Sequence, residues 1–194
     1  MNKILLILAL IVPKLAIAKI QCNEKTKHPI FCSILKLRPH LNRDFAFKLS
    51  NHIHKYSQMY KIDPYRSIAI IMQESSFRNV HTTKTVMFKK RELCDQLPYK
   101  KCILPQYTIL KGIQDIGIFQ LNVATLKDYK LNPIQAMEDI EYATYCHFLI
   151  LKSKMKLCKK YGKDSWTCYH SRTPKLRKRY KKMVDKYYFP KKTK

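Results

Sequence analysis

The chain has 194 residues, a length that favours a single folded domain. Its 39 lysines and arginines against 13 aspartates and glutamates give a formal net charge of +26, which indicates an anionic partner. Charge alone does not choose among nucleic acid, cell-wall polymers and phosphorylated lipid head groups. With only three glycines, nine prolines and no internal repeat, the chain has little room for an all-β fold, so we expect a mainly helical one.

The first residues of the chain resemble a secretory signal. Lys3 supplies a positive charge, an apolar stretch spans residues 4–12, and the small-x-small cleavage site A-I-A ends at Ala18. Lys14 interrupts the apolar stretch, which is short beside the roughly 18 residues that a membrane-spanning helix needs. We therefore expect residues 1–18 to be a signal peptide cleaved near Ala18, with export to the periplasm or the extracellular space. An uncleaved membrane anchor is the alternative.

All seven cysteines lie beyond this segment, as expected of an exported chain that forms disulfides. Two local pairs are natural by spacing, namely Cys22 with Cys32 and Cys94 with Cys102. A zinc site is the competing interpretation, but the chain has no C-x-x-C or H-E-x-x-H spacing. We expect no metal and no other cofactor.

The three remaining cysteines are Cys146, Cys158 and Cys168. The first two stand twelve residues apart on one expected helix, roughly 18 Å by helical rise and too far apart to bond. Cys158 and Cys168 flank the turn at residues 161–162 almost symmetrically. We therefore favour a Cys158–Cys168 disulfide and expect Cys146 to be free.

Apolar residues at spacings of three and four predict helices along most of the chain. The expected helices run from Leu41 to Tyr56, Asp63 to Ser75, Asn122 to Lys130, Pro133 to Gly162, around Trp166 and Tyr169, and from Pro174 to Tyr187. This predicts one compact domain over residues 41–189, preceded by an N-terminal arm at 19–40 and followed by a basic tail at 190–194. The helical pattern breaks down at residues 77–112, which we interpret as an irregular, disulfide-tied insertion beside a cleft.

Glu74 is the candidate catalytic residue. It lies near the end of an apolar helix that Asp63 caps and Pro64 starts. Water is scarce at such a position, and burial raises the pKa of a carboxyl group toward the range of a general acid. The simpler alternative is a helix-terminal glutamate paired with a surface lysine. Downstream, residues 114–122 (Q-D-I-G-I-F-Q-L-N) form a polar, glycine-containing turn of the kind that lines clefts. Together the two segments indicate cleavage of a glycan.

Three segments resemble the soluble lytic transglycosylase (SLT) family of the lysozyme-like superfamily. They are the E-S pair that ends the apolar helix, D-I-G-I-F-Q-L-N at residues 115–122, and W-x-x-Y-x-S at residues 166–171. The resemblance covers roughly Tyr56 to Tyr187 and is closest to the small single-domain members that serve secretion and conjugation machines. It implies a lysozyme-like α+β fold that is mostly α, with the catalytic glutamate at a helix end facing the cleft.

The resemblance also implies roles for individual residues. Glu74 matches the sole catalytic acid/base, and Tyr169 matches the tyrosine whose hydroxyl orients that glutamate. Ser75 matches the residue that supports the glutamate. The cleft residues in contact with substrate are then expected to be Ser75, Gly117, Phe119, Gln120, Asn122 and, next to Tyr169, His170.

The chain departs from the family pattern at three positions. Phe119 stands where methionine is usual, and His170 and Arg172 replace the asparagine and glycine of the last motif. The segment between the first two motifs is also longer than is usual. These departures bear on specificity and rate more than on the fold.

The reaction implied is cleavage of the β-1,4 bond between N-acetylmuramic acid and N-acetylglucosamine, with a 1,6-anhydro-muramoyl end as product. Asp115 leaves an alternative open, because D-I-G-I-F-Q-L-N also resembles the turn of animal c-type lysozymes that carries a second catalytic carboxylate. Two carboxylates about 5 Å apart would give retaining hydrolysis instead. A muramidase using Glu74 and Asp115 is therefore the nearest rival.

The expected partner is the glycan strand of peptidoglycan, acted on by a monomer. The basic run at residues 175–182 predicts a solvated helix face or an attachment to an anionic wall or membrane surface. A secretion apparatus is a further candidate partner. Two rivals come from other classes: a non-catalytic cationic binder of walls or membranes, and a nucleic-acid binder, which the thin aromatic interleaving of the basic run disfavours.

Overall fold

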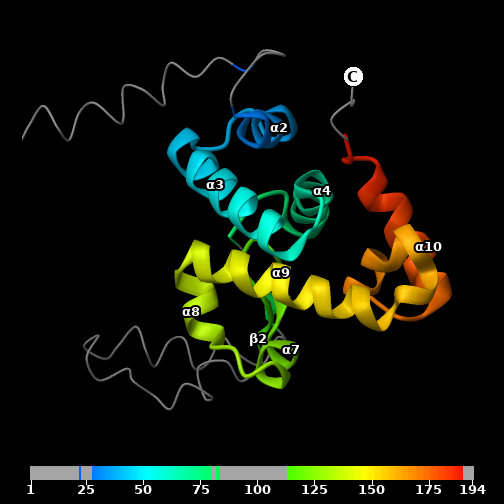
Figure 1. Cartoon of the computed structure of the whole chain (residues 1–194). Helices are drawn as coiled ribbons and strands as arrows, with labels where there is room; N and C mark the ends of the chain where they lie inside the picture. Colours follow the sequence, from blue (N-terminus) through cyan, green and yellow to red (C-terminus); the bar gives the residue numbers. More distant parts are fainter. Residues whose placement is uncertain (1–21, 23–27, 80–81, 84–112, 190–194) are drawn as a thin grey trace, which may run out of the picture.

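The computed structural model describes residues 22, 28–79, 82–83 and 113–189 (Figure 1). The expected signal peptide, the basic tail, most of the insertion and the expected Cys94–Cys102 pair lie outside the described residues. Within the part described, no helix has the length and apolar character to cross a membrane.

The first three helices build the centre of the fold. They are α2 (Pro29–Leu37), α3 (Arg43–Tyr60) and α4 (Pro64–Ser75). The start of α4 agrees with its sequence signals: the Asp63 side chain accepts a hydrogen bond from the backbone N–H of Tyr65 at 2.9 Å, and Pro64 follows the cap. Four successive residues of α4, 68–71, are buried, so this helix is enclosed on several sides. Helix α2 packs on α3 and α4 through Phe31 and Ile34 and thus contributes to the core.

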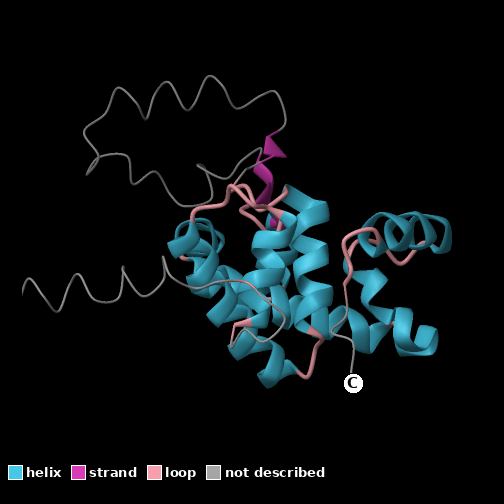
Figure 2. Cartoon of the chain, turned by 90° about the horizontal axis from the view of Figure 1, so that it is seen from above, coloured by secondary structure: helices cyan, strands magenta, loops and turns pink. Residues whose placement is uncertain are grey.

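A small antiparallel sheet follows, with strands β1 (Thr82–Thr83), β2 (Ile113–Ile116) and β3 (Leu121–Asn122) in the order β1-β2-β3. Asp115 pairs with Asn122, and Ile116 pairs with Leu121. The segment predicted as a cleft-lining turn is therefore a hairpin whose tip is residues 117–120. Figure 2 shows the strands as a minor element at one edge of a helical body.

The long helix predicted from Pro133 to Gly162 is wrong in its continuity and in its end. The chain instead forms α8 (Pro133–Glu138) and α9 (Ile140–Leu157). The short helix predicted from Asn122 to Lys130 is present before them as α7 (Val123–Asp128). Asp139 breaks α8 from α9 because its backbone is extended (φ −110°, ψ 110°) and its side chain accepts hydrogen bonds from the backbone N–H groups of Glu141 and Tyr142. An aspartate competes well for such a cap, so a second helix begins where the periodicity predicts a continuous one.

The last two elements are the 3₁₀ segment η3 (Lys159–Tyr169) and helix α10 (Pro174–Asp185). A 3₁₀ segment thus stands where a helix around Trp166 is predicted. It is kinked at Gly162, whose φ of 55° lies in the left-handed region that glycine adopts without strain. Helix α9 packs against α3 on one side and η3 at its end, and α10 packs against α4 and η3 (Figure 1).

Two disulfides are present among the described residues, Cys22–Cys32 and Cys158–Cys168, and both are pairs that the sequence predicts. Cys146 is free and buried in α9, and burial raises the pKa of its thiol to about 12. The Cys158–Cys168 bond brackets the kink at Gly162 and ties the end of α9 to the end of η3.

Candidate active site

A cleft of about 480 Å³ opens at the C-terminal end of α4. Its lining residues come from α4, the β2–β3 hairpin, α7, α9, the end of η3 and the segment that joins η3 to α10. Its lining residues are Glu74, Gln114, Asp115, Gln120, Leu121, Asn122, Thr125, Ile150, Lys154, Cys168, Tyr169, His170, Ser171 and Arg172. The helix-end glutamate and the hairpin, 40 residues apart in the sequence at their nearest lining residues (Glu74 and Gln114), therefore face the same space.

Glu74 stands in a poorly hydrated part of this cleft. Burial raises the pKa of its carboxyl group, the hydrogen bond from Tyr180 lowers it, and the negative charge of Asp115 raises it, with a net upward result. The Tyr180 hydroxyl donates to Oε1 of Glu74 at 2.5 Å. A carboxylic acid with a raised pKa and a fixed orientation has the properties of a general acid.

The hydroxyl that orients Glu74 thus belongs to Tyr180, and the prediction of Tyr169 for this role is corrected. Tyr180 is 1% exposed, and its ring stacks on that of His170 at 4.6 Å. Burial keeps the pKa of the Tyr180 hydroxyl well above its usual value, so it remains a neutral donor. The helical period places Tyr180 on the buried face of the last helix, but nothing in the sequence indicates which residue its hydroxyl meets.

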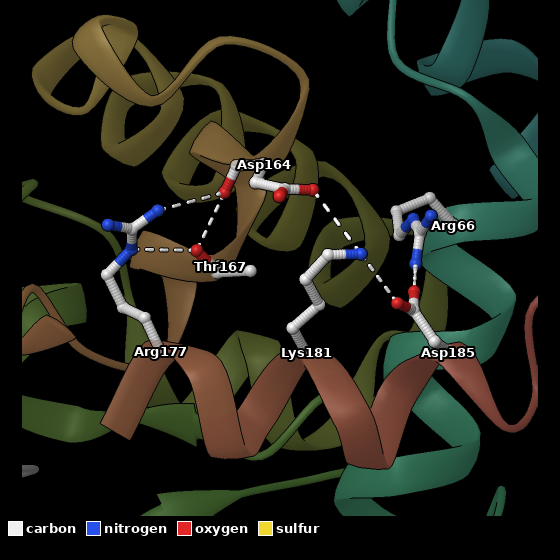
Figure 3. Close-up of polar contacts among 6 residues, drawn as sticks. All are labelled: Arg66, Asp164, Thr167, Arg177, Lys181 and Asp185. Carbon is white, nitrogen blue, oxygen red and sulfur yellow. Dashed lines mark hydrogen bonds and ion pairs between the residues drawn. The ribbon is translucent and has the colours of Figure 1, made fainter. Parts of the chain in front are cut away.

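Helix α10 is held against the rest of the molecule by a chain of charged contacts (Figure 3). Arg66 of α4 pairs with Asp185 at 2.5 Å, and Lys181 bridges Asp185 at 2.6 Å and Asp164 at 3.5 Å. Closer to the start of α10, the buried Arg177 donates from Nε to Oγ1 of Thr167 at 2.8 Å and from its terminal nitrogen to the backbone carbonyl of Asp164 at 3.4 Å. These contacts lie on both sides of Tyr180 along the helix and so fix its position beside Glu74.

The tip of the hairpin has an unusual backbone that its sequence explains. Gly117 and Gln120 both have positive φ, 68° and 47°. Glycine adopts this conformation readily, whereas Gln120 is held in it by hydrogen bonds from its backbone N–H and its side-chain Nε2 to the carbonyl of Gly117, at 3.2 and 2.7 Å. The turn is therefore closed on itself with the Gln120 side chain at the cleft.

Two hydroxyl groups from other elements donate hydrogen bonds to the hairpin tip. Ser75 donates to the carbonyl of Ile118 at 2.6 Å, and Tyr169 donates to the carbonyl of Phe119 at 3.2 Å. The first bond ties the tip to the end of α4, next to Glu74, and the second ties it to the end of η3. Ser75 therefore supports the turn beside the glutamate.

Three of the six residues predicted to contact substrate face away from the cleft. Ser75 is 4% exposed and its hydroxyl is bonded to backbone carbonyls, Phe119 is fully buried, and Gly117 is also buried. None of the three lines the cleft, so the structure gives their predicted substrate contacts no support. Gly117 and Phe119 lie in the buried hairpin tip, and Ser75 at the end of α4 is bonded to backbone carbonyls. Gln120, Asn122 and His170 do line the cleft.

Asp115 also lines the cleft and is held in place by Asn122. The Asn122 side chain donates from Nδ2 to Oδ1 of Asp115 at 3.1 Å and to the carbonyl of Gln114 at 3.3 Å, while its Oδ1 accepts from the backbone N–H of Thr125 and so caps α7. Asn122 thereby links the position of the second cleft carboxylate to the start of a helix.

A buried histidine below the cleft escaped the sequence analysis. His147 of α9 is fully buried, and both of its ring nitrogens are hydrogen-bonded, Nε2 with Ser67 at 2.9 Å and Nδ1 with Tyr169 at 3.1 Å. Burial lowers the pKa of His147 to about 3, so its ring is neutral. A single histidine in an apolar helix carries no sequence signal for such a role, because its partners come from α4 and η3.

No group of histidine, cysteine, aspartate or glutamate side chains suited to a metal ion lies within the ranges that the structure describes.

The model of the transglycosylase SLT domain matches residues 51–186. The match spans Glu74, the hairpin, Tyr169 and Tyr180. The chain belongs to the SLT transglycosylase family. No curated protein and no solved structure matches the chain significantly.

Membership in the SLT family confirms the family and the mainly helical, lysozyme-like fold class predicted from the motifs. Members of the family are lytic transglycosylases, so this SLT protein is an enzyme that cleaves the glycan strands of peptidoglycan and binds them as substrate. Because peptidoglycan lies outside the cytoplasmic membrane, the protein acts outside the cytoplasm.

Proposed function

We propose that the chain is an exported lytic transglycosylase in which Glu74 is the single acid/base and the products carry 1,6-anhydro-muramoyl ends. One observation carries the proposal: in the cleft of an SLT domain, burial raises the pKa of Glu74 while the Tyr180 hydroxyl holds its carboxyl group at 2.5 Å. Such a group can give up a proton and take one back within a single turnover.

The reaction proceeds in two proton transfers. The protonated Glu74 donates its proton to the oxygen of the bond between N-acetylmuramic acid and N-acetylglucosamine, and that bond breaks through an oxocarbenium-like state. The C6 hydroxyl of the muramoyl residue then attacks C1, and its proton passes to the carboxylate of Glu74. The anhydro ring closes without water, and the acid is restored. Between the two transfers, the hydrogen bond from Tyr180 stabilises the carboxylate.

Substitution of the glutamate tests the first part. Glu74→Gln is expected to abolish turnover of purified sacculi without unfolding the protein, because the amide keeps the shape and loses the proton. The matched control is Glu138→Gln, which changes an exposed glutamate of α8 outside the cleft and should turn over at the wild-type rate. Full activity of Glu74→Gln would refute the proposal.

A hydrolytic muramidase remains the second candidate, favoured by the presence of Asp115 in the same cleft. In that mechanism Asp115 would act as the second carboxylate and water would enter the product. Mass spectrometry of the released muropeptides separates the two, since anhydro products are lighter by one water than hydrolysed ones. Asp115→Asn should retain anhydro product formation if Glu74 works alone, whereas loss of turnover with hydrolysed wild-type products would favour the muramidase.

Two cations of the cleft support an anionic substrate. Lys154 and Arg172 line it, and neither forms an ion pair with a carboxylate among the described residues. Peptidoglycan strands carry carboxylates on their peptide stems, so these cations suit them. The basic outer face of α10 is a further attachment site for an anionic wall or membrane surface, and a secretion apparatus is a further partner. We expect a monomer.

The proposed function also implies boundaries for the signal peptide and the catalytic domain. Residues 1–18 are removed as a signal peptide, and 41–189 form the catalytic domain with its insertion at 77–112. The arm predicted at 19–40 joins that domain through α2, which packs on α3 and α4. Residues 190–194 are a basic tail. N-terminal sequencing of the protein recovered outside the cytoplasm should begin just after Ala18. A non-catalytic binder of walls or membranes would instead bind sacculi and release no anhydro or reducing-end product.

A further inference from the structure

Ser67, His147 and Tyr169 form a buried chain of hydrogen bonds that we name the His147 bridge. It runs from Ser67 on α4 through the imidazole of His147 on α9 to the Tyr169 hydroxyl at the end of η3, with distances of 2.9 and 3.1 Å. The Tyr169 hydroxyl continues to the backbone carbonyl of Phe119 at 3.2 Å. Helix α4 and the consecutive elements α9 and η3 are thus linked to one carbonyl group of the hairpin tip.

The direction of each proton in the His147 bridge follows from its last partner. A carbonyl oxygen only accepts, so the single hydroxyl proton of Tyr169 points to Phe119. The Tyr169 oxygen must then accept from His147, which assigns the imidazole proton to Nδ1. Nε2 is left as an acceptor for the Ser67 hydroxyl. Burial favours the neutral imidazole, and the neutral ring fits this set of donors and acceptors in the tautomer protonated at Nδ1.

The surroundings of His147 keep it in that state. The Phe119 ring stacks on the imidazole at 4.5 Å with the planes 21° apart, and the rings of Tyr169 and Phe148 meet it edge-on at 5.1 and 5.3 Å. Among the described residues, burial is the cause that lowers the pKa of His147, and no charged group contributes to that shift. An aromatic ring at position 119, where the related family usually has methionine, therefore completes the box around the imidazole.

The hairpin tip is the element that the His147 bridge can control. The carbonyl of Phe119 is held by Tyr169, and the neighbouring carbonyl of Ile118 is held by Ser75, the residue after Glu74. The next residue, Gln120, has a φ of 47° and lines the cleft. Of these two bonds between a side chain and the tip, loss of the Tyr169 contact would leave the one from Ser75.

We propose that His147 is a positioning residue: by holding the Tyr169 hydroxyl on the carbonyl of Phe119, it fixes the hairpin tip and keeps Glu74 shielded from water. This inference rests on the proposed role of Glu74 as the acid/base. His147 itself touches neither the cleft nor Glu74, so its effect must pass through Tyr169 and residues 117–120.

The test is the pH dependence of kcat/KM for His147→Phe, which keeps a buried ring and removes both hydrogen bonds. The groups near Glu74 are Tyr180 from α10, Asp115 from β2 and Tyr169 from η3, with His170 stacked behind Tyr180. The cations Lys154 and Arg172 line the same cleft. All remain in the variant. Water admitted at the tip should lower the pKa of Glu74, because it reduces the cost of the carboxylate charge. The alkaline limb of the kcat/KM profile, where Glu74 loses its proton, should therefore move to lower pH by about half a pH unit or more. We expect kcat to fall on the order of tenfold because the tip is misplaced.

The matched control is Thr144→Val on the same helix. Thr144 is fully buried and its hydroxyl donates to the carbonyl of Ile140 at 2.6 Å, outside the cleft. The control should have a lower melting temperature than the wild type and the same alkaline limb of the kcat/KM profile. The inference is overturned if His147→Phe, like the control, lowers the melting temperature and leaves kcat and the pH profile unchanged. That outcome leaves the proposed function intact, whereas full activity of the Glu74→Gln variant would refute the proposed function itself.

A measurement on the unmodified protein covers the case in which His147→Phe does not fold. Nitrogen-15 NMR of the imidazole should report the neutral tautomer protonated at Nδ1 throughout pH 4.5–8. An Nε2-protonated ring, or a titration near pH 6.5, would contradict the His147 bridge directly.

Discussion

At the scale of single residues, burial decides the protonation state of each group around the cleft. The Glu74 carboxyl, the Tyr180 hydroxyl and the His147 imidazole are all held toward their neutral forms, because a charge costs more free energy where water is scarce. Only Tyr180 opposes this for Glu74, because its hydrogen bond favours the carboxylate. The site therefore combines an acid whose pKa is raised with a donor that stabilises its conjugate base.

The Tyr180→Phe variant should separate the effect of burial on the pKa of Glu74 from the effect of the Tyr180 hydrogen bond. Without the hydroxyl, the pKa of Glu74 rises further, and the alkaline limb of kcat/KM should move to higher pH. We expect kcat to fall by about 10- to 100-fold, because the carboxylate between the two proton transfers loses its donor. The pH–rate profile checks this against the wild type. A limb that moves to lower pH would contradict the assignment.

His147 should also leave a signature in stability. Its folded pKa of about 3 lies below the value of about 6.5 for an unfolded histidine, so between these values only the unfolded chain takes up the proton. The contribution of the neutral His147 to the free energy of unfolding is complete above pH 6.5. It is lost as pH falls through this window, at about 1.4 kcal/mol per pH unit. Urea unfolding at pH 5 and 6.5 should show this slope in the wild type and not in His147→Phe. Equal slopes would contradict the assignment.

At the scale of elements, α10 carries Tyr180 and is docked by two kinds of charge contact. Arg177 is nearly buried, bonds to Thr167 and the Asp164 carbonyl, and lies 3.4 Å over the Tyr161 ring. The Arg66–Asp185–Lys181 contacts lie nearer the surface and are partly solvated. Buried arginine contacts stabilise more than solvated ion pairs, so the first kind should dominate the docking.

A pair of substitutions checks this ranking. Arg177→Ala should lower the free energy of unfolding by about 2–3 kcal/mol through lost hydrogen bonds and stacking. Asp185→Asn should cost only about 0.5–1 kcal/mol, with the loss shrinking in high salt. Urea unfolding measures both, and kcat should fall more in Arg177→Ala because Tyr180 loses its support. The reverse order of stabilities would show that the surface ion pairs hold the helix.

At the scale of the whole molecule, the cations of α10 lie on two faces, one turned to the protein and one exposed. Helix α10 turns Arg177 and Lys181 inward to acidic or carbonyl partners, while Lys175, Lys178 and Lys182 are exposed. In a chain of net charge +26, such exposed cations raise the local concentration of an anionic polymer next to the cleft.

Binding to sacculi should therefore depend on salt. The Debye length falls from about 10 Å at 0.1 M to about 3 Å at 1 M, so pelleting of the inactive Glu74→Gln variant with sacculi should weaken about tenfold across that range. Replacing Lys175, Lys178 and Lys182 by glutamine should flatten the dependence. The control is the same set of changes at Lys48, Lys159 and Lys160, exposed positions outside the cleft lining. Equal flattening in both sets would assign the effect to net charge and not to α10.

Several features could be predicted from the sequence because their causes are local. Asp63 and Pro64 mark the start of α4 whatever surrounds them, and Gly117 marks a turn that needs positive φ. The break at Asp139 could not be separated from a continuous helix, because a cap competes with the helical period by a margin of about 1 kcal/mol that the sequence pattern does not resolve.

The sequence by itself determined the helical class, the family and the place of Glu74 at a helix end, since these depend on helical period, capping and short motifs. Only the tertiary structure decided which hydroxyl meets that glutamate: Tyr180 lies 106 residues away from it, and Tyr169 turns instead to Phe119 and His147. Tyr169 and Tyr180 are both aromatic residues on inward faces, and a period cannot say where a hydroxyl points. The packing of α10 against α4 and η3 makes that choice.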